Sequence, residues 1–439
     1  MTTGTRRWSR ATTTEGPTRV EDSRRASVVG QLFDGVLRSA AMHLCNGEEP
    51  LAAEVWASGL LAVWDDGLGQ DGDDAAEADS PVPSGPEHGR QRAFCEALIR
   101  HARAQGTPEA MAVLMAIAAV APARPATKAR TAAAGLARKG VPAPGWADEV
   151  GRAVPTEAWV GRDVYGDQEI LIVGYAYPGG SEHSLCVLVD HNLAGAAKDA
   201  YPAGALADTL SRWKEAESSG ITLAPVSLAD LSGRAADALM ATDYHPEAEA
   251  GRRLTELRAL LATRLGSLPT GASAGQPELG SEARERLVAE FLSSPEAADL
   301  LAEPSAVVVC HSLVAYRCDY GDGDPFRWSP TVAAVCLLDH FPAKVTLDGP
   351  DLFIVPDVLC GWVRFAGRKR GLPHGAVGRT LDTVVACRDD FAAAMADESR
   401  FGPAKRVAME MLAEGIDLTD EVAVSEWVAA YSGRSASSV

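Results

Sequence analysis

A short polar run at the end of a predicted strand is the part of the sequence best suited to chemistry. Asp190, His191 and Asn192 follow an apolar stretch directly, and Lys198 and Asp199 come a few residues later. Open α/β sheets bind ligands at such strand ends. A carboxylate beside an imidazole orients a general base or binds a divalent metal, and a lysine stabilises an anionic intermediate. Asp190, His191, Lys198 and Asp199 are therefore candidate catalytic residues.

The same run has a simpler structural interpretation. Adjacent residues on a strand point to opposite faces, so Asp190 and His191 cooperate only if the chain turns between them. Asp and Asn are also preferred helix caps, so Asp190 and Asn192 would cap the following helix while His191 satisfies a backbone group. Capping is favoured over catalysis.

A possible metal site would draw on cysteines and histidines in the C-terminal third. The residues are Cys310, His311, Cys318, Cys336, His340 and Cys360. Their spacing matches none of the paired short-range patterns of structural zinc sites. Cys336 and His340 share one helix face, but within an apolar stretch where cysteine behaves as a small hydrophobe. We expect core packing, and we predict no cofactor.

One basic cluster is evident in the C-terminal third. Arg364, Arg368, Lys369 and Arg370 are candidates for phosphate or partner contact, and the final two predicted helices are compatible with a helix-turn-helix. The alternative is that these cations complement the dipole at a helix C-terminus. The net charge of −19 repels polyanions and favours this alternative, so nucleic acid is not an expected partner.

Several well-known signatures are absent from the sequence. It contains no G-x-S-x-G elbow, P-loop, H-E-x-x-H helix or G-x-G-x-x-G motif after a strand. No apolar run follows the N-terminal arginines, as a signal peptide would require. The longest apolar stretch, 110–121, falls short of the roughly 20 residues of a membrane span. We expect a cytoplasmic protein without membrane contact, its eight cysteines reduced.

The elements that must position these residues are mostly helical. Apolar residues recur at helical spacing in 27–44 and 50–64, and helices are also predicted at 91–105, 107–120 and 125–139. In the C-terminal third, helices are predicted from Ser281 and at 329–340, 351–370, 375–396, 403–413 and 420–431, whereas the apolar run at 306–316 is ambiguous and 319–324 is a Gly/Asp loop. The segments 169–177 and 183–190 are rich in Ile, Val, Leu and Tyr, and the Pro-Gly-Gly-Ser turn between them predicts a β-hairpin. Both strands are apolar on each face, so helices predicted at 204–218, 227–241 and 246–265 would cover them.

These elements predict a mostly α fold with a small α+β or α/β central unit, in which helical bundles flank a hairpin-containing core. Composition suggests the domain boundaries. The predicted segments are a disordered basic tail at 1–26, a helical domain at 27–150 with an acidic loop at 65–89, a small α/β unit at 151–265 containing the 169–190 hairpin, a linker at 266–280, a helical domain at 281–433 and a disordered tail at 434–439.

Three segments carry a resemblance to other proteins. FRWSPTVAAVCLLDHFPAKVTLDG begins at Phe326, VPDVLCGWVRFAGRKRG ends at Gly371, and LVDHNLAGAAKDAY spans 188–201. They resemble stretches in uncharacterised proteins of high-GC actinobacteria that have no assigned activity. The resemblance implies a bacterial, cytoplasmic setting.

The weak chemical motifs and the acidic composition favour a soluble cytoplasmic interaction or regulatory protein without catalytic activity, working with a protein partner. One alternative is a hydrolase or metal-dependent enzyme using Asp190, His191 and Asn192. Another is nucleic-acid binding through the C-terminal helices. Convergence of Asp190, His191 and Asp199 in a cleft would favour the enzyme, whereas an isolated His191 would argue against it.

Overall fold

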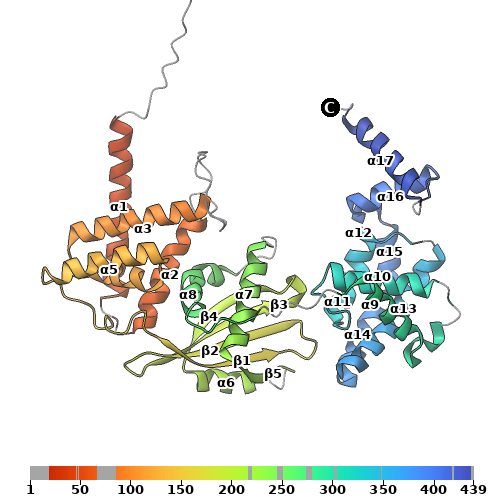
Figure 1. Ribbon diagram of the computed structural model, residues 1–439, viewed down its shortest axis with the longest axis horizontal. Helices are drawn as coiled ribbons and strands as arrows, with labels where there is room; N and C mark the ends of the chain where they lie inside the picture. Colours follow the sequence, from red (N-terminus) through yellow and green to blue (C-terminus); the bar gives the residue numbers. More distant parts are fainter. Residues whose placement is uncertain are drawn as a thin grey trace, which may run out of the picture. The chain divides into compact units, whose positions relative to one another are not determined.

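The structure is a computed structural model, whose helices and strands are labelled in Figure 1. Contacts divide the chain into two units. It describes residues 19–45, 47, 49–66, 86–215, 220–244, 251–272, 279–300, 303, 305–347, 349–417 and 420–436. Unit 1 comprises Met1–Val154, Ala176–Ser181 and Arg252–Ser267. Unit 2 comprises Pro155–Tyr175, Glu182–Gly251 and Leu268–Val439.

Unit 1 is helical. Its helices are α1 (Arg19–His43), α2 (Pro50–Asp66), α3 (Pro86–Gln105), α4 (Pro108–Val120), α5 (Ala123–Ala137) and α8 (Arg252–Leu265). Helix α4 begins as predicted, because the Thr107 hydroxyl accepts a hydrogen bond from the Ala110 amide at 3.3 Å and Pro108 occupies the first turn. Most of α4 is buried.

A buried ion cluster joins α8 and the turn of the predicted hairpin to α2. Glu54 on α2 is fully buried and pairs with Arg264 of α8, which is 2% exposed. The Tyr177 hydroxyl donates to Glu54 Oε2 at 2.6 Å, and the Gly151 amide donates to Oε1 at 2.6 Å. Arg264 also donates to the Tyr177 hydroxyl at 2.9 Å. Buried charges are tolerated when they are paired and hydrogen-bonded, as both are here.

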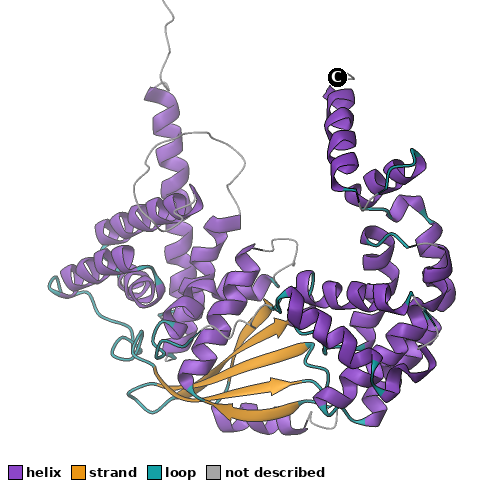
Figure 2. Cartoon of the chain, turned by 45° about the vertical axis from the view of Figure 1, so that its right-hand side comes forward, coloured by secondary structure: helices purple, strands orange, loops and turns teal. Residues whose placement is uncertain are grey.

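Unit 2 contains a five-stranded antiparallel sheet in the order β4-β3-β2-β1-β5 (Figure 2). The strands are β1 (Val154–Arg162), β2 (Gln168–Ala176), β3 (Glu182–Asp190), β4 (Ala196–Ala203) and β5 (Thr222–Val226). Strands β2 and β3 confirm the predicted hairpin, and their interiors are buried on both faces. Strands β1, β4 and β5 were not predicted from the sequence, because their less complete burial leaves no continuous apolar run.

Helices α6 (Leu206–Glu215) and α7 (Leu228–Tyr244) pack on the sheet. Leu210 of α6 joins a core cluster with Ile170 and Ile172, which share one face of β2. The Thr242 hydroxyl of α7 donates to the Ala197 carbonyl of β4 at 3.1 Å. Two of the three helices expected to cover the sheet are therefore confirmed, whereas α8, the third, belongs to unit 1.

The rest of unit 2 is helical. Its helices are α9 (Ser281–Leu292), α10 (Ala306–Asp319), α11 (Pro330–Val335), α12 (Phe341–Lys344), α13 (Gly349–Arg370), α14 (His374–Ala386), α15 (Arg388–Ala396), α16 (Pro403–Ala413) and α17 (Glu421–Ala436). Phe291, Trp362 and Phe365 pack edge to face in their core. Together with the sheet, these helices confirm the mostly α fold with a small sheet. No helix among the described residues is long and apolar enough to cross a bilayer.

The two units differ from the domains that were predicted from composition. The sheet and the C-terminal helices form one unit, although the sequence analysis separated 151–265 from 281–433. Residues 19–26 and 434–436 are helical where disordered tails were predicted, and both ends of the predicted acidic loop continue α2 and α3. Extending an existing helix is far easier than starting one, which accounts for these longer ends. Residues 67–85 of the loop and 273–278 of the predicted linker lie outside the described residues.

Candidate functional site

The turn after β3 directs His191 into a pocket of unit 2. Residues 191–193 form a single 3-10 turn, and the His191 amide donates to the Asp167 carbonyl at 2.8 Å. The turn ends in two left-handed residues, Ala194 with φ of 54° and Gly195 with φ of 76°. A non-glycine residue rarely adopts this conformation, so the backbone here is tightly constrained. The chain therefore turns at the place where cooperation between Asp190 and His191 would require it.

The acidic partner of His191 is Glu169, near the start of β2. Glu169 is 3% exposed, and its Oε2 lies 3.6 Å from His191 Nε2. Arg162 Nε donates to Glu169 Oε1 at 2.8 Å, and Arg234 of α7 donates to the same oxygen at 3.2 Å. Burial raises the pKa of the Glu169 carboxyl, but the neighbouring His191, Arg162 and Arg234 outweigh burial and hold this pKa below its ordinary value.

A pocket of about 760 Å³ opens beside this carboxylate. Its volume lies within the range of about 300–1,000 Å³ typical of ligand sites. The charged and histidine residues that line it are Arg162, Glu169, His191, Arg234, Asp237, Asp322, Asp324, Arg327 and Arg370. Met240 and Tyr244, which are largely exposed on α7, add an apolar edge. The pocket thus suits a polar, charged ligand.

Arg327, a further residue of the pocket lining, is held by several buried partners. It is 2% exposed, pairs with Asp167, and donates from Nε to Asp322 Oδ2 at 2.6 Å. It also donates to the Asn192 side-chain oxygen at 2.8 Å and to the His191 carbonyl at 2.9 Å. Burial raises the pKa of Asp322, but Arg317 and Arg327 outweigh it and lower this pKa overall. Arg327 therefore fixes the turn that carries His191.

The predicted catalytic group separates into two parts. His191 lines the pocket, whereas Asp190, Lys198 and Asp199 are not among its lining residues. The Asp190 carboxylate accepts a hydrogen bond from the Asn192 amide at 2.9 Å and lies 3.4 Å from Lys198 Nζ. Asp199 accepts a hydrogen bond from the Ala200 amide at 2.8 Å. The capping interpretation describes Asp190, while His191 has a carboxylate partner that the sequence analysis did not name.

The basic cluster at the end of α13 is largely paired with carboxylates. Arg368 donates to Glu296 at 2.6 and 3.1 Å. Lys369 pairs with Glu290, and Arg370 pairs with Asp324 at 2.8 Å. Arg364 is exposed. Three of the four cations thus already have an anionic partner, which weakens the attraction of this helix end for phosphate.

The candidate metal residues lie in different surroundings. Cys310 and Cys336 are fully buried in the helical core of unit 2, and burial raises the pKa of the Cys310 thiol to about 12. Metal ions bind the thiolate, so this shift opposes coordination. The His340 ring packs on the rings of Tyr316 and Tyr320 at 4.6 and 4.8 Å. Within the described ranges, no three His, Cys, Asp or Glu residues are arranged to hold a metal ion.

Comparison with protein-family models, with curated proteins and with solved structures found no match to this chain. Glu169, Arg162, Arg234 and Arg327 were not predicted as site residues from the sequence. Glu169 alone had a local signal, because a carboxylate that opens an otherwise apolar strand must find a partner once it is buried.

Proposed function

We propose that unit 2 binds a small anionic ligand in this pocket, and that the chain acts as a non-catalytic regulatory protein in the cytoplasm. The observation that supports the proposal is the sharing of one buried carboxylate, Glu169, by Arg162, Arg234 and His191. Two guanidinium groups against one carboxylate leave a surplus of positive charge beside Glu169, although the four arginines of the whole lining are matched by Glu169, Asp237, Asp322 and Asp324. A ligand carboxylate or phosphate would neutralise this surplus.

Arg234 adds a second argument. Its Nε is buried without a hydrogen-bond partner among the described residues, although its side chain is 29% exposed. A buried donor without an acceptor is costly, by about 1–3 kcal/mol. An anion at the edge of the pocket could draw the guanidinium into a better geometry and remove this cost.

The residues that line the pocket come from distant segments of unit 2, which favours a regulatory role. Arg162 ends β1, Arg234 lies on α7, and Arg370 lies at the end of α13. A ligand contacting all three would couple segments that are distant in the sequence. Binding would stabilise their joint arrangement, which a protein partner can recognise.

Thermal unfolding of the full chain tests the proposal. We expect citrate or phosphate, compared with chloride at equal ionic strength, to raise the unfolding temperature in a concentration-dependent way. Arg234→Gln should weaken the apparent affinity about tenfold, because it removes a charge-assisted hydrogen bond. The matched control is Arg212→Gln, on the exposed side of α6 and outside the pocket lining. An equal response in both variants, or none in the unmodified protein, would contradict the proposal.

A hydrolase is the second candidate, favoured by the distance of 3.6 Å between His191 Nε2 and Glu169 Oε2. A carboxylate that orients an imidazole is the arrangement of a general base. Hydrolysis of p-nitrophenyl esters and phosphate esters, with and without added divalent metal, would test it. Activity lost in His191→Gln but kept in His311→Gln, on an exposed face of α10, would favour the enzyme over the binding protein.

A further inference from the structure

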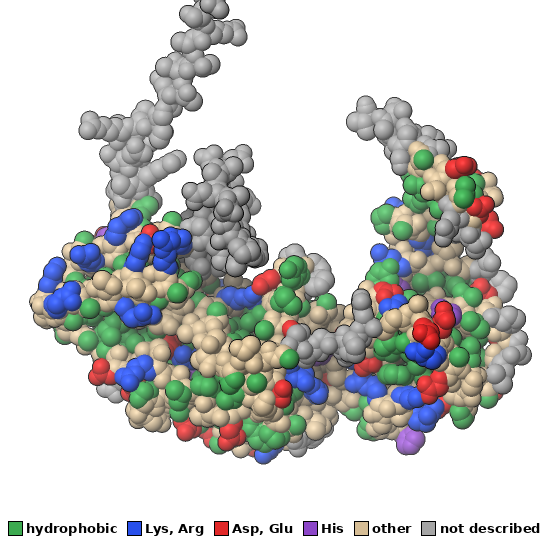
Figure 3. Space-filling model, viewed as in Figure 1, with side chains coloured by type: hydrophobic (Ala, Val, Ile, Leu, Met, Phe, Trp, Pro, Cys, Tyr) green, Lys and Arg blue, Asp and Glu red, His purple; other side chains and the backbone are tan. Residues whose placement is uncertain are grey.

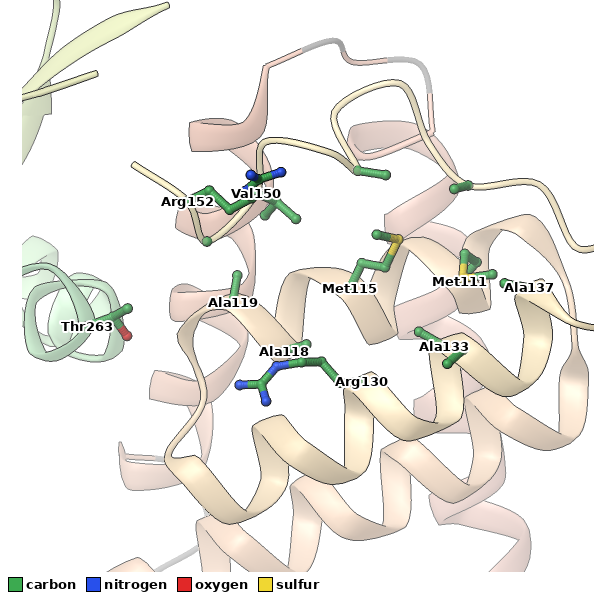
Figure 4. Close-up of a pocket in the computed structure, with 14 residues that line it drawn as sticks. Met111, Met115, Ala118, Ala119, Arg130, Ala133, Ala137, Val150, Arg152 and Thr263 are labelled. Atoms are coloured by element: carbon green, nitrogen blue, oxygen red, sulfur yellow. The ribbon is translucent and has the colours of Figure 1, made fainter. Parts of the chain in front are cut away.

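Unit 1 contains a pocket of its own. Its volume is about 650 Å³, within the usual range for small-molecule sites. The walls come from α4, α5, the segment 143–152 and Thr263 of α8 (Figure 4). All these elements belong to unit 1.

The walls are apolar and built mainly from small side chains. Met111, Met115, Ala118 and Ala119 contribute from α4. Three alanines of α5, including Ala133, also line the pocket. Alanine leaves open the space that a larger side chain would fill, and methionine adapts its shape to an apolar ligand. The pocket therefore offers a flexible apolar surface.

Two arginines supply the charge in this pocket. Arg130 of α5 and Arg152 are both exposed, and Figure 4 shows them on either side of Ala118 and Ala119. Arg152 donates to the Asp148 carbonyl at 2.9 Å, and no ion pair involves Arg130 within the described part of the chain. The lining residues include no aspartate or glutamate. The charge of the pocket is thus positive and uncompensated by its own walls.

The surroundings reinforce this charge. Lys and Arg side chains gather over α3 and α5 in Figure 3, although the chain as a whole is strongly acidic. The exposed cations of these helices include Arg92, Arg100, Arg103, Arg124 and Lys128. Glu96 offsets only Arg92 and Lys128, at 3.4 and 2.6 Å. A local positive field attracts anions toward this face of unit 1.

We propose that the pocket of unit 1 binds a small amphipathic carboxylic acid. Its hydrocarbon part would lie against the methionines and alanines, and its carboxylate would contact Arg130 and Arg152. Arginine suits this role, because its planar guanidinium binds carboxylates through two parallel hydrogen bonds. The site is independent of the anion pocket in unit 2 and uses none of its residues.

Isothermal titration calorimetry of the full chain with decanoate tests the proposal. We expect one decanoate per chain, and we expect decylamine, which has the same apolar tail with the opposite charge, to bind at least tenfold more weakly. Arg130→Gln and Arg152→Gln should each weaken decanoate binding about tenfold. Arg212→Gln, which changes an exposed arginine of α6 in unit 2 that lines neither pocket, is the matched control and should bind like the unmodified protein.

A second variant tests the apolar walls. Ala134→Leu places a larger side chain at an exposed lining position of α5, where leucine is well tolerated in a helix. It should abolish decanoate binding while the unfolding temperature stays within a few degrees of that of the unmodified protein. Three results would overturn the proposal: no decanoate binding, equal binding of decylamine, or binding only to anionic vesicles of phosphatidylglycerol. The last would identify the basic face of unit 1 as a surface for membranes.

Discussion

In unit 1 the charged side chains of the buried ion cluster lie outside the pocket lining, whereas in unit 2 the buried charges line the pocket themselves. Glu54, Arg264 and Tyr177 are absent from the lining of the first pocket, although the cluster touches it through the Gly151 amide. Glu169, Asp322 and Arg327 are part of the lining of the second. Substitutions in the ion cluster of unit 1 should therefore change stability without changing ligand binding. Substitutions of the buried charges of unit 2 should change both.

The difference follows from how each unit is built. The ion cluster of unit 1 ties helices and a hairpin turn together, and its charges compensate one another in the interior. In unit 2 the inner strand β3 ends in a turn that Arg327 fixes from a distant segment, so the charges needed for folding lie beside the cavity. A ligand of unit 2 would therefore bind next to the contacts that hold its own site together.

The largest effect is expected from Glu54→Gln in unit 1. The change leaves Arg264 buried without a charged partner, which should lower the free energy of unfolding by about 3–5 kcal/mol. Chemical denaturation, with hydrogen exchange of unit 1 peptides, measures the loss. The citrate response of unit 2 should persist at temperatures where the variant is folded.

The double variant Glu54→Leu with Arg264→Met provides the control. Replacing both charges by apolar groups removes the uncompensated charge, so this protein should be more stable than Glu54→Gln alone. If the double variant is as unstable as the single one, the loss comes from packing and the cluster does not act through charge.

Arg327→Met should have the next largest effect, and here stability and binding should fall together. Asp167, Asp322 and Asn192 lose a common donor, which we expect to cost about 3 kcal/mol. The turn carrying His191 loses its anchor, so the citrate response should also disappear. A variant that unfolds more easily but responds to citrate with unchanged affinity would refute the coupling proposed for unit 2.

The sequence indicated one member of the unit 2 site, because its signal is local. His191 follows an apolar strand within a few residues, and the capping preference of Asp190 is equally local. The partners of His191 come from elsewhere in the chain. Arg234 lies 65 residues from Glu169, and Arg327 lies 160 residues from Asp167. No periodicity or motif encodes such pairings, which depend on how strands and helices assemble.

The fold itself could be predicted where the apolar pattern was strong. The β2–β3 hairpin and α4 have continuous apolar runs, and both were predicted. Strand β5 has a mixed burial pattern and pairs through its backbone with β1, so its residues carried little signal. The single helix predicted at 375–396 is divided at Cys387 into α14 and α15. The break was not predicted, because the apolar pattern continues from α14 into α15.

The smallest effect is expected from pH and concerns unit 2. Burial lowers the pKa of His340 from 6.5 to about 4, with Lys344 adding to the shift. The folded protein keeps this ring neutral, so its contribution to stability is fully present above pH 6.5. That contribution is lost as the pH falls toward 4. Between pH 7 and pH 5 the titration of His340 should lower the unfolding free energy by about 1 kcal/mol. This value is reduced to allow for the partial exposure of the ring to solvent.

His340→Phe isolates this contribution, because phenylalanine keeps a ring against Tyr316 and Tyr320 but does not titrate. Its unfolding free energy should depend less steeply on pH than that of the unmodified protein between pH 7 and pH 5. Hydrogen exchange should locate the difference in peptides of unit 2, since His340 belongs to that unit. An NMR titration giving His340 a pKa near 6.5 would mean that the ring is solvated and that unit 2 has no such sensitivity to acid.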